Sequence, residues 1–279
     1  MSDEYDLDSG PDPATFAAAS AEPDIDEATD DPVSVVGVGP GNREYLTPRG
    51  ERAIREADVL VGFTTVVELV EELTDADLLT CGYKDEAAAL ETFGERVAAG
   101  ESGTAVAMGD PNHSGYQFVG KVQNAVEQSS TSPDSHTRRD AVERATPERP
   151  VRIVPGISSL QVAASRARIP MEDAEFVTLH KSGDLEDGVD RLARAVVEDG
   201  RHLLALPRPY DRMPGDLAEL LLERGADPEL EALVCERLTH DDERIHRFTL
   251  ADLSAHAGGD GPEDTPFLDL VVLAVRQPV

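Results

Sequence analysis

Glycines follow an apolar, β-branched run near the beginning of the chain. The run occupies residues 33–36, and Gly37, Gly39, Pro40 and Gly41 come after it. An apolar run bounded by turn residues predicts a buried strand. Because glycine has no Cβ, the loop would let a ligand approach the backbone closely. A glycine-rich turn at the carboxyl end of a buried strand is a common ligand site in α/β proteins, so we expect binding chemistry here.

Phosphate groups fit this loop poorly. A dinucleotide loop of the Rossmann type reads Gly-x-Gly-x-x-Gly and is followed by an acidic residue that ends the next strand. Here the third glycine comes one residue early, and Asp58 precedes the next expected strand. Pro40 has no N–H to offer to a pyrophosphate, and no Gly-Lys-Ser/Thr follows as in a P-loop. Two interpretations stay open: a plain tight turn, or a site for a ligand without phosphate.

A second loop of this kind follows the strand expected over residues 104–108. It contains Gly109, Asp110 and His113. Asp110 could hold a cationic or hydroxyl group of a ligand, and it could equally cap the turn through its carboxylate.

A third loop, residues 155–159, ends in Ser158 and Ser159 after the strand expected over 151–154. Serine at such a place is typical of a helix N-cap. The exposed N–H groups of a helix start would also suit a ligand carboxylate. His180 ends a further expected strand, where it could assist proton transfer or be a hydrogen-bonded structural residue.

The elements that must position these loops alternate between apolar strands and amphipathic helices. This alternation predicts an α/β protein with two α/β domains. The first 31 residues are acidic and poor in large apolar side chains, which indicates disorder. The expected organisation is a disordered acidic tail at 1–31, an N-terminal α/β domain at 32–127, an exposed linker or insertion at 128–150 and a C-terminal α/β domain at 151–279.

The composition indicates a habitat more than a chemistry. The formal net charge is −31 and only three lysines occur, a pattern typical of adaptation to a high-salt cytoplasm. Such a charge disfavours nucleic acid as a partner. No run of eighteen apolar residues and no signal peptide are present, so we expect a cytoplasmic protein without a membrane span. Cys81 and Cys235 have no CxxC partner and are expected to be reduced thiols, and the scattered histidines do not indicate a metal site.

Four motifs, in this order and spacing, resemble the tetrapyrrole (corrin/porphyrin) methyltransferase family: residues 35–41, 45–47, 109–111 and 154–159. The resemblance implies two α/β domains with the cofactor, S-adenosylmethionine, in a cleft between them, and a homodimer. Within the family, the motifs at 155–161, 169–170, 179–180 and 235–238 are most similar to the branch that methylates carbon C5 of cobalt-precorrin-7 in anaerobic cobalamin biosynthesis. Methyl transfer of this kind is an in-line displacement that depends mainly on proximity and orientation.

The family pattern also implies roles for individual residues. The cofactor would be bound by Gly39, Pro40, Gly109, Asp110, His113, Ser158, Ser159 and Leu206. The substrate would contact Gly37, Gly41 and Lys181, and His180 would contact the macrocycle or remove a proton. Since the macrocycle carries many carboxylates, Lys84, Lys121 and Lys181, with arginines such as Arg43 and Arg166, are expected to form a cationic rim.

Other functions remain open at this stage. The same fold could methylate another precorrin position or act in diphthamide synthesis, and a separate decarboxylating precorrin methyltransferase could be a partner. From different classes, an NAD(P)-dependent oxidoreductase is disfavoured by the short glycine spacing, and a non-catalytic nucleotide sensor is the remaining alternative.

Overall fold

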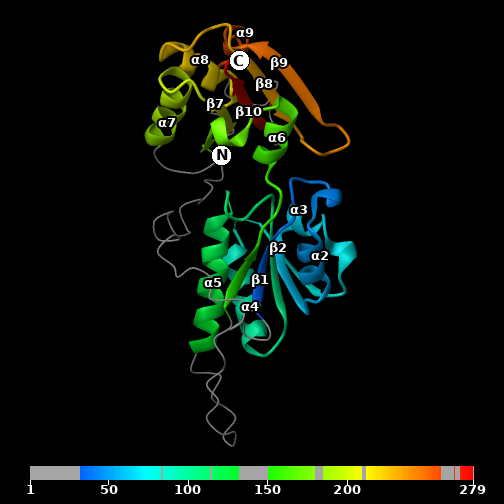
Figure 1. Cartoon of the computed structure of the whole chain (residues 1–279). Coiled ribbons are helices and arrows are strands. Elements are labelled where there is room, and N and C mark those ends of the chain that lie inside the picture. The colour runs from blue at the N-terminus through cyan, green and yellow to red at the C-terminus, as the bar shows by residue number, and fades with distance from the viewer. Residues whose placement is uncertain are drawn as a thin grey trace, which may run out of the picture. The chain divides into compact units, whose positions relative to one another are not determined.

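The computed structural model describes residues 32–82, 84–113, 115–131, 150–179, 185–208, 212–258, 267 and 271–278. The chain divides into two compact units, one up to Ile157 and one from Ser158 onward (Figure 1). Each unit contains one five-stranded sheet with helices, which confirms the expected α/β class. The predicted tail at 1–31 and most of the predicted insertion at 128–150 lie outside the described residues.

The first unit is built from alternating strands and helices. Its elements are β1 (Val33–Gly37), η2 (Arg43–Tyr45), α2 (Pro48–Arg55), β2 (Val59–Phe63), α3 (Thr64–Val67), η3 (Glu71–Leu73), β3 (Asp77–Cys81), α4 (Glu86–Ala98), β4 (Gly103–Ala107), α5 (Tyr116–Thr131) and β5 (Val151–Val154). Thr47 caps α2 by accepting a hydrogen bond from the Gly50 N–H, and Pro48 occupies the first helical position, as expected for a helix start.

The sheet of the first unit has the strand order β3-β2-β4-β1-β5, and all of its pairs are parallel. Side chains of β1 alternate between the two faces. Val33 and Val35 pack with residues of α4 and α5, whereas Val36 packs with residues of α2 and α3. Figure 1 shows these two pairs of helices on opposite faces of the sheet. The carboxyl ends of all five strands therefore lie at one edge.

Three features of the first unit differ from the sequence-based expectation. Strand β5 pairs with β1, so the first sheet includes residues that were assigned to the second domain. This pairing is a long-range contact that the local sequence does not encode. Helix α5 runs to Thr131, into the segment at 128–150 that was expected to be an exposed linker or insertion, and the Ser130 hydroxyl donates to the carbonyl of Val126. Strand β3, an exposed edge strand, was not expected.

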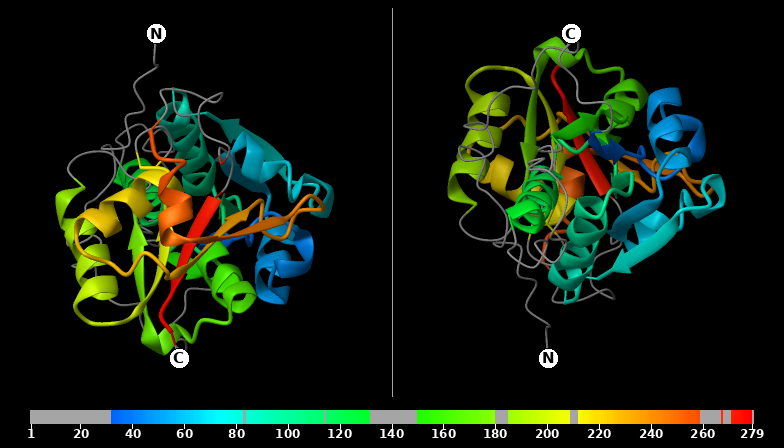
Figure 2. Two further views of the ribbon diagram at one scale, coloured as in Figure 1. Left: turned by 90° about the horizontal axis from the view of Figure 1, so that it is seen from above. Right: turned by 90° about the horizontal axis from the view of Figure 1, so that it is seen from below.

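The second unit carries a mixed sheet. Its elements are α6 (Ser159–Ala167), η5 (Met171–Asp173), β6 (Ala174–Thr178), α7 (Glu186–Val197), β7 (His202–Leu206), α8 (Pro214–Glu223), β8 (Glu231–Glu236), β9 (Arg244–Thr249), α9 (Leu250–Ser254) and β10 (Val271–Arg276). The strand order is β6-β7-β10-β8-β9, with β10, red in Figure 2, antiparallel to both neighbours. Strands β6, β7 and β8 consequently run in the same direction.

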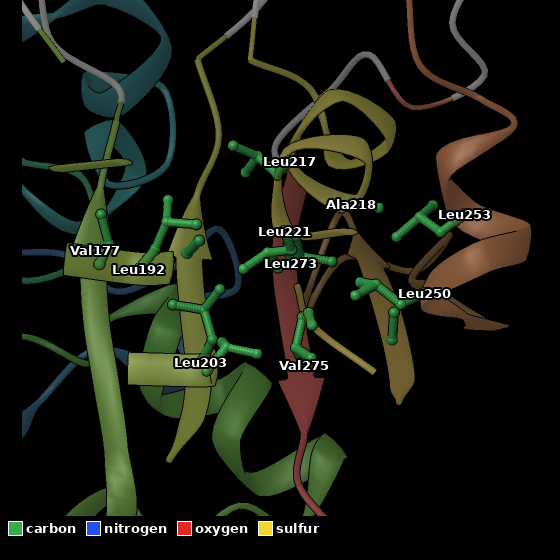
Figure 3. Close-up of a cluster of buried hydrophobic side chains, with 14 of the residues drawn as sticks. Val177, Leu192, Leu203, Leu217, Ala218, Leu221, Leu250, Leu253, Leu273 and Val275 are labelled. Carbon is green, nitrogen blue, oxygen red and sulfur yellow. The ribbon is translucent and has the colours of Figure 1, made fainter. Parts of the chain in front are cut away.

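A core of leucine, valine and alanine side chains joins this sheet to α7, α8 and α9. Figure 3 shows Val177, Leu203 and Leu273 from the strands together with Leu192, Leu217 and Leu253 from the helices. Burial of such side chains is the main favourable term in folding.

Both cysteines are free and buried, as expected for reduced thiols. Cys81 ends β3, where its Sγ donates to the carbonyl of Gly62 at 3.5 Å. Burial, reinforced by the nearby Glu86 carboxylate, raises the pKa of Cys81 to about 11. Burial, with Glu243, likewise raises the pKa of Cys235 to about 11.

We expect both thiols to resist alkylation in the folded protein, because a pKa near 11 leaves only about one thiol in a thousand ionised at pH 8. Iodoacetamide labelling followed by mass spectrometry should modify neither cysteine in the native chain. Both should be modified rapidly in guanidinium chloride, which serves as the control. Native labelling at the denatured rate would contradict this environment.

Candidate functional site

Three loops meet at the carboxyl edge of the first sheet, and they meet through glycine. A Cβ placed on Gly37 would lie 2.5 Å from the carbonyl oxygen of Gly109 and 2.7 Å from the backbone nitrogen of Gly156. A Cβ on Gly156 would lie 2.1 Å from the same Gly109 oxygen. These distances leave no room for any side chain, so the ends of β1, β4 and β5 touch backbone to backbone.

Hydrogen bonds continue the pairing of β1 and β4 beyond the strands. The N–H of Val38 donates to the carbonyl of Ala107 at 2.9 Å. Gly39 and Gly109 then exchange two bonds, of 2.8 Å from the Gly109 N–H and 3.3 Å from the Gly39 N–H. Gly39 and Gly109 adopt φ values of 86° and 66°, and Gly41 one of 131°, which side chains disfavour.

This ladder explains why the loop does not suit a phosphate. Phosphate loops present several free backbone N–H groups to one anion. Here the N–H groups of Val38 and Gly39 already donate within the structure, and Pro40 has none. The loop retains close access to its backbone without an anion cradle, which fits a ligand that carries no phosphate.

The loop lies where the topology of the sheet changes direction. The chain leaves β1 toward β2 on one side and leaves β4 toward β5 on the other, and β1 and β4 are neighbours. The helices that follow these two strands, α2 and α5, therefore cover opposite faces. Ligands of open α/β sheets bind outside the carboxyl ends of the strands at such a point.

Asp110 and His113 shape the loop after β4. The Asp110 Oδ1 accepts from the Asn112 N–H at 2.8 Å and from the Asn112 side-chain amide at 3.2 Å. The backbone N–H of His113 donates to the carbonyl of Asp110 at 3.0 Å. Asp110 thus holds the turn that leads to α5, which is the capping role open to it from the sequence.

Ser158 caps α6. Its hydroxyl accepts from the Leu160 N–H at 3.1 Å, and its own N–H donates to the side chain of Gln161 at 2.8 Å, which completes a capping box. Ser159 is the first residue of the helix. The capping interpretation of Ser158 is therefore confirmed, while Ser159 does not serve as the N-cap.

Leu206 is the last residue of β7 and is half-buried, outside the apolar core of the second unit. Its carbonyl accepts from the Leu179 N–H at 2.9 Å, which places it at the carboxyl end of β6 as well. His180 and Lys181 follow Leu179 and lie outside the described residues.

The structure thus brings Gly37, Gly39 and Gly109 together, and it adds Gly156, whose part in the site the sequence reasoning did not single out. The sequence did contain a signal for this glycine, because Pro155 and Gly156 directly follow the strand expected over 151–154.

Three of the cations expected on a substrate rim are bonded to glutamates. Lys121 Nζ lies 2.6 Å from a Glu86 carboxylate oxygen, in a pair that is largely buried. Arg43 pairs with Glu72 at 2.7 Å. Arg166 pairs with Glu243 at 2.6 Å, discussed below. The pairs of Lys121 and Arg166 are partly buried and link elements of one unit, whereas the Arg43–Glu72 pair is exposed. The cationic rim stays a prediction.

Within the described ranges, no group of three His, Cys, Asp or Glu side chains could hold a metal ion. In the same part of the chain, no helix is long and apolar enough to cross a bilayer. The close contact among the three loops of the first unit is made by backbone atoms.

The sequence model of the tetrapyrrole (corrin/porphyrin) methylases matches residues 32–126 and 134–254. A Methanocaldococcus jannaschii protein described as a probable cobalt-precorrin-7 C(5)-methyltransferase is 26% identical over 235 residues, which is 82% of this chain and 92% of that protein. The fold resembles a crystal structure of the methyltransferase CobJ, with a TM-score of 0.64, 22% identity, and coverage of 88% of this chain and 94% of the other. It also resembles the uroporphyrin-III C-methyltransferase of Thermus thermophilus complexed with S-adenosylhomocysteine, with a TM-score of 0.54, 22% identity, and coverage of 88% and 92%.

We expect Gly156→Ala to destabilise the first unit by about 1–3 kcal/mol or more, because its methyl group would overlap the backbone of two other loops. The midpoint of denaturant unfolding measures this loss. Gly82→Ala is the matched control, since Gly82 follows β3 at the same edge and its Cβ would meet only Asp85 Oδ1, at 3.5 Å. Equal midpoints for the two variants would show that the glycine contact is not a constraint.

Proposed function

Since the chain belongs to the tetrapyrrole (corrin/porphyrin) methylase family, a family of S-adenosylmethionine-dependent methyltransferases, we propose that it methylates carbon C5 of cobalt-precorrin-7 in cobalamin biosynthesis. The observation that supports this choice of acceptor is the similarity to the M. jannaschii relative, which covers 82% of this chain and 92% of that protein. The glycine loops support S-adenosylmethionine as the cofactor.

The loops of the first unit fit S-adenosylmethionine in one testable respect. That cofactor has no phosphate, and the loop formed by Val38, Gly39 and Pro40 has no set of free N–H groups for one. Gly39, Pro40, Gly109, Asp110 and His113 would hold the cofactor in this proposal, largely through the backbone. By the family resemblance, Ser158, Ser159 and Leu206 are further proposed cofactor contacts.

When bound, S-adenosylmethionine supplies a methyl group on a positively charged sulfur that departs as a neutral thioether. The contribution of the chain is positional, since fixed loops raise the rate by orienting the reacting groups. Gly37, Gly109 and Gly156 are in mutual contact, so no side chain projects from them where the three loops meet. Gly37, Gly41 and Lys181 would contact the acceptor, and His180 would accept the proton that its carbon loses.

Isothermal titration calorimetry should show binding of S-adenosylhomocysteine and no binding of NAD. The reason is the absence of a pyrophosphate cradle in the Gly37–Gly41 loop. The titrations belong in concentrated potassium chloride, because a net charge of −31 is strongly self-repelling at low ionic strength. Binding of NAD in place of the thioether would favour the oxidoreductase alternative.

Incubation with S-adenosylmethionine and a series of cobalt-precorrins should give a methylated product from cobalt-precorrin-7 alone. Mass spectrometry detects the added methyl group, and NMR of the product locates it. A product methylated at another ring carbon would retain the family activity and refute the proposed position. A lack of any product, together with a lack of thioether binding, would refute the proposed function.

A further inference from the structure

The turn between β8 and β9, residues 237–243, has an unusual backbone. Arg237 has a φ of 49° and Thr239 a φ of 72°. A positive φ is uncommon for any residue other than glycine, and for a β-branched residue such as threonine it is an outlier. Holding a residue at such a φ costs about 1–3 kcal/mol of stability, and residues of this kind are concentrated at functional sites. The turn is therefore a candidate for a role beyond linking two strands.

One carboxylate holds the turn in this form. Glu243 accepts a hydrogen bond from the Thr239 N–H at 2.7 Å. The same carboxylate receives two bonds from Arg166 in the last turn of α6, at 2.6 Å from Nε and 3.2 Å from Nη2. Its side chain is only 21% exposed. Bidentate, charge-assisted bonds of this type are the strong ones in proteins, so Glu243 fastens the turn to α6.

The turn lies at the same edge of the second sheet as Leu206. Strands β6, β7 and β8 run in the same direction, so their carboxyl ends share one edge. Leu206 ends β7 there, and Glu236 ends β8 immediately before the turn. In α/β proteins this is the edge that binds ligands.

The turn carries the carboxylates of Asp241, Asp242 and Glu243 and one guanidinium, that of Arg237. The turn presents the guanidinium of Arg237, which pairs with Asp242 at 2.7 Å in a half-exposed position. Exposed pairs of this kind contribute little to stability and can exchange partners. A guanidinium binds the carboxylates of a tetrapyrrole in bidentate fashion once the turn places it correctly.

We propose that Glu243 is a positioning residue, which holds the β8–β9 turn in its left-handed form so that Arg237 can bind a carboxylate of the tetrapyrrole acceptor. This inference rests on the proposed methyltransferase function. Glu243 itself touches Arg166 and the turn, and it acts on the acceptor only through them.

Steady-state kinetics of Glu243→Ala with cobalt-precorrin-7 and S-adenosylmethionine test the proposal. The KM for the acceptor should rise about tenfold, the loss of roughly one charge-assisted bond. The KM for S-adenosylmethionine and the affinity for S-adenosylhomocysteine should stay at their wild-type values. If the alanine variant does not fold, Glu243→Gln replaces it, and a smaller rise in the same direction is expected because the amide oxygen can still accept from Thr239.

A second substitution separates positioning from general stability. Glycine adopts a positive φ without strain, so Thr239→Gly should let the turn keep its form without the carboxylate. In Glu243→Ala/Thr239→Gly, the acceptor KM should return to within about threefold of the wild type. A role confined to stability predicts no such recovery.

Glu175→Ala is the matched control. Glu175 is 20% exposed and pairs with Arg191 and Arg201, but it lies near the beginning of β6, at the opposite edge of the sheet. This variant should lose stability and keep both KM values. Equal effects of Glu175→Ala and Glu243→Ala on the acceptor KM would overturn the inference while leaving wild-type methyl transfer intact. Failure of the wild type to turn over would instead overturn the proposed function.

Discussion

The contact among Gly37, Gly109 and Gly156 is the constraint on which the first unit depends. Three strand ends approach so closely that backbone atoms fill the space in which any Cβ would lie. This approach requires the strand order that places β1 between β4 and β5. The helices after β1 and β4 leave on opposite faces of the sheet. The close backbone contact at this edge thus follows from the strand order and from the lack of side chains.

Several basic side chains have a different role from the one expected from the sequence. In a chain of net charge −31, basic residues are few and were expected to gather around an acidic substrate. Lys121, Arg43 and Arg166 instead bind glutamates that belong to other elements of the same unit. An excess of carboxylates makes such pairing hard to avoid. Composition alone cannot indicate which basic side chains are paired within the chain in this way.

The sequence predicted the parts of the fold that depend on local residue types. Strands β1, β2 and β4 follow from their apolar runs, the cap of α6 follows from Ser158, and the glycine loops follow from residues that adopt a positive φ without strain. Features that depend on distant partners were not predictable. The placement of β5 beside β1 is one, and the bond between Glu243 and Arg166, 77 residues apart, is another. The left-handed turn at Thr239 gave no local signal, because threonine ordinarily avoids that conformation.

The two units hold left-handed backbone by different physical means, with different consequences. Gly39 and Gly109 adopt positive φ values without strain, because glycine has no Cβ. Thr239 instead donates its N–H to the carboxylate of Glu243, whose pKa is held below its ordinary value by the hydrogen bond from Arg166, against the opposing effect of burial. A lowered folded-state pKa contributes stability above the ordinary value, and this contribution is lost as the pH falls through the lowered one. Salt weakens such a short, partly buried pair far less than exposed pairs such as Arg43–Glu72. At high ionic strength, an ion pair can therefore hold a turn only where its carboxylate is partly buried, as that of Glu243 is.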